Sequence, residues 1–159
     1  MLNRAARLAL PRVRVQRGVM LLEALIGSLI FSIGILALVA MHAQAFRASA
    51  EAKYRSDASY LANSIIGRMW TDRSNLAAYK HRETDTAGKI CEPTGADSAK
   101  ADVTTWLAKI AADLPGASAS LQQIKVNTAT NEVTVSVCWV SPQDNEPHRH
   151  QVVAYINAG

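Results

Sequence analysis

Glu23 has the most unusual chemical setting in the chain, because it is the single charged residue in a long apolar stretch, residues 19–41. A carboxylate one turn inside an apolar span costs several kcal/mol unless it is paired or lies near the membrane interface. Its natural partner is a cation close to the start of the same segment. Cleavage after Gly18 would create that cation, the α-amino group of Val19. In a bundle of related helices, Glu23 of one subunit could then meet the amine of its neighbour.

Cys91 and Cys138 are the only cysteines of the chain. In an exported domain, two cysteines form a disulfide more often than they bind a metal. A bond between them would close a long loop and stabilise the fold by about 4 kcal/mol on the chain-entropy model. The alternative, two unpaired cysteines that act as small apolar side chains, stays open.

His148 and His150 alternate along an expected strand, so both side chains face the same side of it. Two imidazoles do not complete a zinc site, which needs three or four ligands, and we interpret the pair as part of an exposed edge strand. No nucleophile triad, metalloprotease motif or phosphate-binding loop can be assembled from the sequence. We therefore predict no catalytic residue, no metal and no cofactor, and a protein that is not an enzyme.

A basic stretch followed by an apolar stretch at the start of the chain would place Glu23 near one end of a membrane-spanning helix. The first 18 residues hold five arginines and no acid, and residues 24–41 then carry no charge. As a helix, residues 19–41 span roughly 35 Å, enough to cross a bilayer core of roughly 30 Å. The arginines predict a cytoplasmic N-terminus and an exported C-terminal part by the positive-inside rule. The high isoelectric point belongs to this leader and does not indicate a nucleic-acid surface.

Two simpler interpretations of this start are a cleaved signal peptide and a plain membrane anchor. A signal peptidase could cut after Ala45, at the small-residue motif Ala43-Gln44-Ala45. The apolar stretch is longer than the hydrophobic region of most signal peptides, however, and the helical pattern continues through the cleavage point. Neither interpretation explains Glu23.

Arg17-Gly18, followed by Val19-Met20-Leu21-Leu22-Glu23 and a long apolar helix, resembles the class III signal of type IV prepilins and pseudopilins. The resemblance implies cleavage between Gly18 and Val19 by an inner-membrane prepilin peptidase, N-methylation of Val19, and a role for Glu23 in the register of assembly. Residues 1–18 would then be a cleaved leader and 19–45 the transmembrane and assembly half of a long helix. Residues 46–159 would form a periplasmic head.

Within this superfamily, the first half of the chain is similar to the PilV-like minor pilins through residues 32–38, Gln44, 60–62 and 67–70. That resemblance implies a single-pass inner-membrane protein that primes assembly of the type IV pilus and then lies at its tip, at the cell surface. The implied partners are other minor pilins, the major pilin, the prepilin peptidase and an adhesin, with no nucleic acid. A minor pseudopilin of type II secretion stays the alternative in the same superfamily. An exported soluble protein with a cleaved signal is the alternative of another class.

Apolar residues at spacings of three and four from Tyr54 to Met69 predict that the helix continues to about Trp70. Residues 71–101 are expected to be irregular, and a short helix should run from about Asp102 to Leu114. Alternating apolar residues predict strands over about 120–128, 132–140 and 148–156, with a turn at 141–147. Trp106 and Trp139 fit core positions, whereas Trp70 fits either the core or a binding surface. The expected fold class is α+β, type IV pilin-like: a long N-terminal helix, transmembrane and then amphipathic, packed against a small antiparallel sheet.

Overall fold

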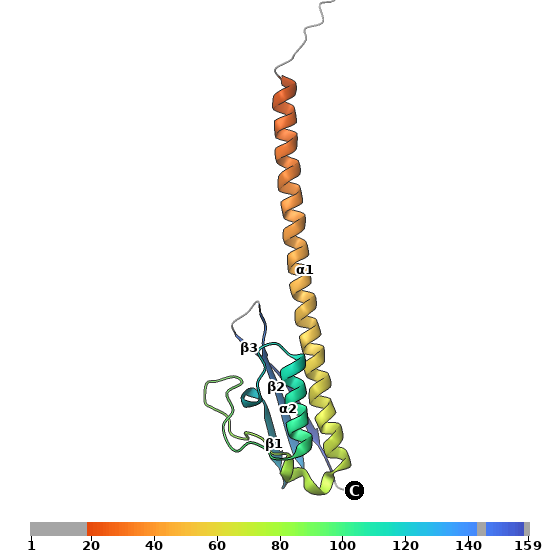
Figure 1. Cartoon of the computed structure of the whole chain (residues 1–159), viewed down its shortest axis with the longest axis vertical. Coiled ribbons are helices and arrows are strands. Elements are labelled where there is room, and N and C mark those ends of the chain that lie inside the picture. Colours follow the sequence, from red (N-terminus) through yellow and green to blue (C-terminus); the bar gives the residue numbers. More distant parts are fainter. Residues whose placement is uncertain (1–18, 143–145, 158–159) are drawn as a thin grey trace, which may run out of the picture. The chain divides into compact units, whose positions relative to one another are not determined.

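The computed structural model describes residues 19–142 and 146–157. The chain divides into two compact units, Met1–Gln44 and Ala45–Gly159. Figure 1 shows the helices and strands in their order along the chain. They are the α-helices α1 (Val19–Thr71) and α2 (Ala101–Asp113), the 3₁₀ helices η1 (Arg73–Tyr79) and η2 (Ala119–Leu121), and the strands β1 (Gln123–Asn127), β2 (Glu132–Val140) and β3 (Pro147–Tyr155).

The part of α1 that belongs to the second unit buries one side and exposes the other. Spacings of three and four bring its apolar residues to one face of the helix. The fully buried residues are Ala58, Leu61, Ala62, Ile65 and Met69. Tyr60 on the outer side is 65 % exposed, and Trp70 is 44 % exposed. Of the two roles that the sequence left open for Trp70, core packing is therefore excluded.

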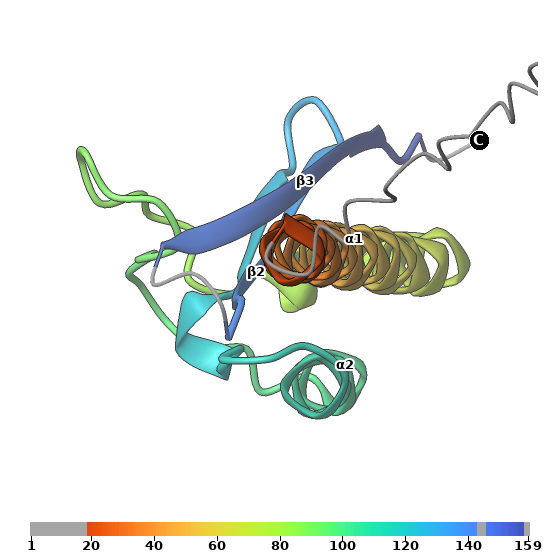
Figure 2. The same ribbon diagram turned by 90° about the horizontal axis from the view of Figure 1, so that it is seen from above.

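Three antiparallel strands form one sheet in the order β1–β2–β3, with β2 in the middle. Along β2, Val133, Val135, Val137 and Trp139 alternate with more polar residues and are at most 1 % exposed, as the period of two predicts. These side chains share one core with apolar residues of α1 and α2. Figure 2 shows both helices on the same side of the sheet. The predicted α+β fold class, with a long helix packed against a small antiparallel sheet, is confirmed.

The short helix α2 joins the same core through one apolar side. Trp106 is buried there, and its Nε1–H donates a hydrogen bond of 2.8 Å to the carbonyl oxygen of Leu61 on α1. The core positions predicted for Trp106 and Trp139 are confirmed. Shortly after α2, Gly116 adopts a φ of +61°, and a Cβ there would lie 2.8 Å from the Cβ of Val140. Glycine at this position therefore permits both the turn and the close approach to β2.

A polar network joins the end of α1 to the start of α2. Asp72 forms an ion pair of 2.6 Å with Lys100, and Arg68 forms one of 2.8 Å with Asp102. The hydroxyl of the buried Tyr79 donates to either aspartate, with one carboxylate oxygen of each at 3.3 Å. The hydrogen bond from Lys100 is the largest of the contacts that hold the pKa of Asp72 below its usual value.

The fold is expected to lose stability in acid through Asp72. Because the pKa of Asp72 is lower in the folded chain than in the unfolded chain, the unfolded chain binds more protons. This contribution is complete above about pH 5 and is lost as the pH falls through the lowered pKa. Asp72→Asn should therefore reduce the thermal midpoint near neutral pH and flatten its dependence on pH below about pH 5.

This expectation is checked by the fluorescence of the buried Trp106 and Trp139, which follows thermal unfolding of the full chain in detergent across a pH series. Asp57→Asn is the control, since Asp57 forms an ion pair with Lys53 one turn away on α1 and takes no part in the network around Asp72. The control should keep the pH dependence of the wild type. The same pH dependence in Asp72→Asn as in wild type would contradict the role of Asp72.

The ends of the elements differ little from those predicted. β1 begins at Gln123 instead of about residue 120, because residues 119–121 form η2. β3 begins at Pro147, inside the turn expected at 141–147, of which residues 143–145 lie outside the described part. The two elements that the sequence did not indicate are η2 and η1, of which η1 lies in the segment 71–101 that was expected to be irregular.

Candidate functional site

The first unit presents apolar side chains on all sides of its helix. The described residues of this unit, 19–44, are all exposed. Its large apolar side chains are 45–76 % exposed. By length and hydropathy this helix could cross a membrane, although a signal sequence would meet the same criterion. An apolar surface of this extent needs lipid or protein to cover it.

Glu23 lies one turn after Val19, the first residue of α1. The two residues line one apolar patch, which they share with Leu22, Ile26, Gly27 and Ile30. Among the described residues, none forms a hydrogen bond or an ion pair with Glu23. In apolar surroundings this carboxylate would therefore need a cation from outside the described helix.

Gly27 and Gly34 lie seven residues apart on the same side of α1, and a Cβ at either would meet no atom within 4 Å. The chain itself gives no reason for a glycine at these positions, where each reduces helix stability by up to about 1 kcal/mol. Close approach of a second helix would provide a reason. Gly18 lies outside the described residues, as does the leader 1–18. Cleavage after Gly18 and methylation of Val19 therefore stay predictions.

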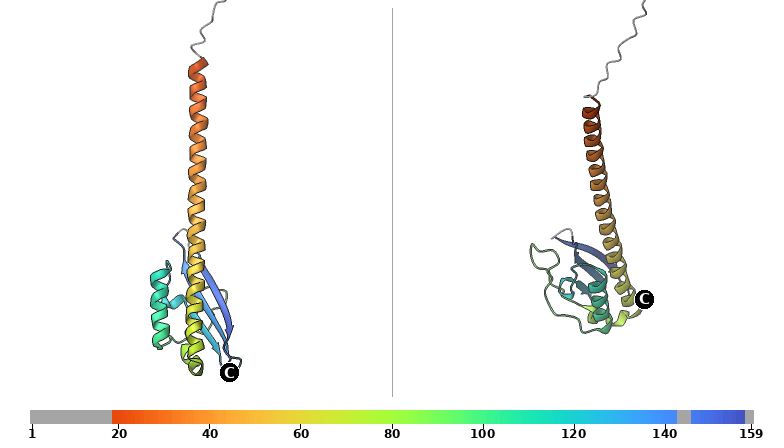
Figure 3. Two further views of the ribbon diagram at one scale, coloured as in Figure 1. Left: turned by 90° about the vertical axis from the view of Figure 1, so that its right-hand side faces the viewer. Right: turned by 45° about the horizontal axis from the view of Figure 1, so that its top comes forward.

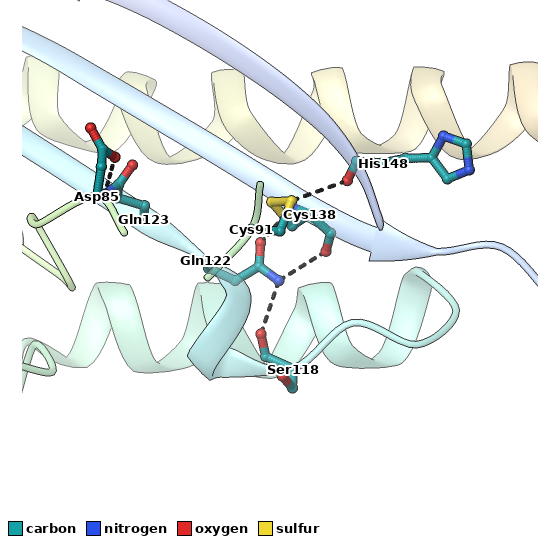
Figure 4. The surroundings of a disulfide bond; sticks show 7 residues. All are labelled: Asp85, Cys91, Ser118, Gln122, Gln123, Cys138 and His148. Carbon is teal, nitrogen blue, oxygen red and sulfur yellow. Dashed lines mark hydrogen bonds between the residues drawn. A yellow bond between two sulfur atoms is a disulfide. The ribbon is translucent and has the colours of Figure 1, made fainter. Parts of the chain in front are cut away.

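A disulfide bond joins Cys91 to Cys138, at a sequence separation of 47 residues. Figure 4 shows the bond linking the loop that contains Cys91 to β2. Cys91 is 6 % exposed and Cys138 is 1 % exposed. The sequence left open whether these cysteines are bonded or unpaired, and in the structure they form a disulfide. The bond fixes the loop between η1 and α2 to the middle of the sheet.

Gln122 completes the surroundings of the disulfide, and sequence reasoning missed it (Figure 4). Its side chain is fully buried. Its Oε1 accepts from the N–H of Cys138 at 2.8 Å, and its Nε2 donates to the carbonyl oxygens of Cys138 at 3.0 Å and Ser118 at 2.9 Å. The side-chain amide thus takes the place of a peptide group beside β2, just before β1 begins. No sequence pattern marks such a residue, because its partners are backbone atoms whose position depends on the fold.

His148 and His150 lie on the edge strand β3, as predicted, but they are half-buried. The register places His148 opposite the buried Trp139, so both histidines are on the core-facing side of the sheet. The ring of His148 stacks on Trp139 with centroids 5.5 Å apart, and its Nδ1 lies 3.5 Å from Oε1 of Glu51 on α1. The predicted edge strand is confirmed, and the two side chains are half-buried because an edge strand still has one face that packs against the core. No group of three or more potential metal ligands occurs in the part of the chain that the structure describes.

The described residues therefore supply an apolar helical surface with one carboxylate in its first turns, and a head held together by a disulfide. No protein-family model, curated protein or solved structure matches the chain. The class of protein must accordingly be inferred from these residues and their geometry.

Proposed function

We propose that the chain is a PilV-like minor pilin, a subunit that takes part in priming and assembly of the type IV pilus. The observation that carries this proposal is Glu23, a carboxylate one turn inside a helix whose apolar length is exposed. A plain membrane anchor has no use for this group, since a charge inside a bilayer costs several kcal/mol. A subunit that must align with its neighbours does have a use for it.

In the proposed mechanism, the prepilin peptidase cuts the peptide bond between Gly18 and Val19, and Val19 then carries a free α-amino group. Glu23 of an incoming subunit pairs with the amine of its neighbour. A helix displaced by one turn, about 5.4 Å, would leave both charges unpaired in apolar surroundings. The pair therefore selects one axial register. Methylation of Val19 leaves the positive charge of the amine in place.

The same proposal assigns a location and partners. Before assembly the subunit lies in the inner membrane, with a cytoplasmic N-terminus and a periplasmic second unit. After assembly it lies at the pilus tip, among other minor pilins, beside the major pilin and with an adhesin as a further partner. The exposed apolar helix supports both states, because lipid covers it in the first and other subunits cover it in the second.

The two alternatives differ in how well the residues support them. A minor pseudopilin of type II secretion would use Gly18, Val19 and Glu23 in the same way. An exported soluble protein cut after Ala45 is less well supported, because α1 is an unbroken helix through residues 43–46. A protease that binds an extended backbone would have to unwind this helix before it could cut.

The substitution Gly18→Ala tests the proposed processing. The added Cβ should obstruct the approach of the peptidase to the backbone, so the precursor is expected to stay uncut. Intact-mass analysis of protein from the native host gives the result. For the wild type it should show the loss of residues 1–18 and one added methyl group on Val19.

Gly27→Ala is the matched control, since a Cβ at Gly27 meets no atom within 4 Å. It makes the same change inside the helix and should leave cleavage after Gly18 intact. A wild-type chain that begins at Phe46 would contradict the pilin proposal, because that is the product of a signal peptidase.

A further inference from the structure

The two edges of the sheet differ in how their backbone groups are satisfied. Along the β1 edge, Ile124 exchanges two hydrogen bonds with His81, one from its N–H at 2.9 Å and one to its carbonyl oxygen at 3.0 Å. The next outward N–H, that of Val126, donates to Oε1 of Glu83 at 3.3 Å. The chain thus covers the β1 edge with its own residues, so that no further strand can pair there.

The described residues provide no such cover for the β3 edge. The N–H and C=O of Ile124 point to His81 and therefore away from β2. Its partner on β2, Val135, does not hydrogen-bond to it and points its own N–H and C=O to β3, because bonded and non-bonded pairs alternate along an antiparallel ladder. Its partner Val152 then bonds inward, and the residues on either side of it point their N–H and C=O groups away from β2. These outward residues are Arg149, Gln151, Val153 and Tyr155. Within residues 19–142 and 146–157, no backbone group forms a hydrogen bond with the outward N–H or C=O groups of these four residues.

The open edge is also long and poorly protected. β3 has nine residues, carries no lysine, and has its only proline at the first position. Natural edge strands are usually shortened, charged or interrupted by proline to prevent pairing with other chains. Val153 is 51 % exposed and Tyr155 is 57 % exposed. Figure 3 (left) shows β3 on the side of the sheet away from α2.

We propose that the β3 edge binds an extended segment of a second protein, which adds to the sheet as a fourth strand. Backbone hydrogen bonds to the four outward residues would give most of the affinity. Side chains set the preference: apolar residues of the segment lie beside Val153 and Tyr155, and an acidic residue lies near Arg149 at the other end. Asp85, which is close to Arg149, also pairs with Lys125, so two cations share this one carboxylate.

A second copy of this chain is a poorer occupant. β3 contains Arg149 and two histidines but no aspartate or glutamate. In two β3 strands side by side, neither strand would therefore supply a carboxylate to pair with Arg149 of the other. This inference does not depend on the proposed role of Glu23 or on the identity of the filament, because it rests on the second unit alone.

Site-specific photo-crosslinking in the native host tests the proposal on the full chain. Benzoylphenylalanine is placed at Gln151, Val153 or Tyr155, and the crosslinked residues of the partner are mapped by mass spectrometry. A fourth strand predicts that all three positions reach one segment of one other protein, at partner residues spaced by two. Crosslinks to a second copy, to residues with helical spacing, or to no protein would each overturn the proposal.

A proline substitution tests the backbone contacts directly. Val153→Pro removes an outward N–H without removing a bond to β2, and proline is tolerated at such edge positions. Crosslinking from Gln151 and Tyr155 is expected to fall about tenfold. Val153→Thr, which keeps the N–H, should crosslink as the wild type does. Equal crosslinking in Val153→Pro and Val153→Thr would overturn the proposal.

Further variants separate the edge from the face of the sheet. Val153→Lys keeps the backbone N–H but adds a charge that disfavours strand addition, so it serves if the proline variant does not fold. Thr134→Lys is its control, because Thr134 lies opposite Val153 in the register, one strand further in. The edge variant should lose the crosslink and the control should keep it. Loss in the control alone would show that the partner binds the face and would overturn the proposal.

Discussion

Glu23→Leu protein is expected to be made, inserted and largely cleaved, and yet to be missing from the minor-pilin complex. The substitution removes a group that is costly in lipid, so a plain anchor would insert as well or better. In the proposed assembly it would leave the α-amino group of a neighbouring Val19 buried without its partner. Breaking a buried ion pair in this way costs about 3–5 kcal/mol, which corresponds to a loss of assembly on the order of a hundredfold or more.

The measurement is co-purification with the other minor pilins, together with a count of sheared surface filaments. Ser28→Leu is the matched control, because it also replaces a polar residue of the same apolar helix by leucine. The hydroxyl of Ser28 only donates to the carbonyl oxygen of Leu25 in its own helix, so assembly should be preserved. Glu23→Asp keeps the charge and should restore part of the assembly. Wild-type recovery and filament counts for Glu23→Leu would show that Glu23 has no role in assembly.

Loss of the disulfide is expected to have the largest effect on the stability of the second unit. Without the bond between Cys91 and Cys138, the unfolded chain regains the entropy of a loop that spans 47 residues of sequence separation. On the chain-entropy model this costs about 4 kcal/mol. For a domain of this size, the thermal midpoint should fall by roughly 10–20 °C.

Two independent ways of removing the bond provide the control. Reduction of the wild type and the double substitution Cys91→Ala, Cys138→Ala should each lower the thermal midpoint measured by tryptophan fluorescence. The reductant should not change the midpoint of the double variant, because that variant has no cysteine left. Without reductant, thiol alkylation of the folded wild type should label neither cysteine. A midpoint that is unchanged by reduction would show that packing alone holds the loop.

The elements that could be predicted are those whose signal is local. The period of α1 between Ala58 and Met69 and the alternation of β2 between Val133 and Trp139 each follow from burial of one face, which can be read from neighbouring residues. The helix η1 could not be predicted, since a single 3₁₀ segment has no comparable period. Trp70 was ambiguous for a similar reason, because it lies beside the buried stripe of α1.

The residues of the candidate site also differ in whether the signal that marks them is local in sequence. Gly18, Val19 and Glu23 are close in sequence, so their relation to the apolar helix could be predicted from the sequence alone. The hydrogen bonds between Gln122 and the backbone of Cys138 depend on pairing between distant segments. The open edge of β3 depends on which strand ends the sheet, which alternation alone does not determine. Residues that act through tertiary neighbours were therefore the ones that sequence reasoning missed.

The disulfide also limits how far the second unit can be stretched under mechanical load. Suppose that a partner pulls on the chain near its C-terminus while α1 is held. The tension then passes through the disulfide, and the residues between Cys91 and Cys138 are not stretched. The separation of 47 residues between the cysteines corresponds to roughly 160 Å of contour length that the bond withholds from extension. A chain that is pulled open would thus stay shorter by this length, and β2 would stay joined to its loop when the tension is released and the chain refolds.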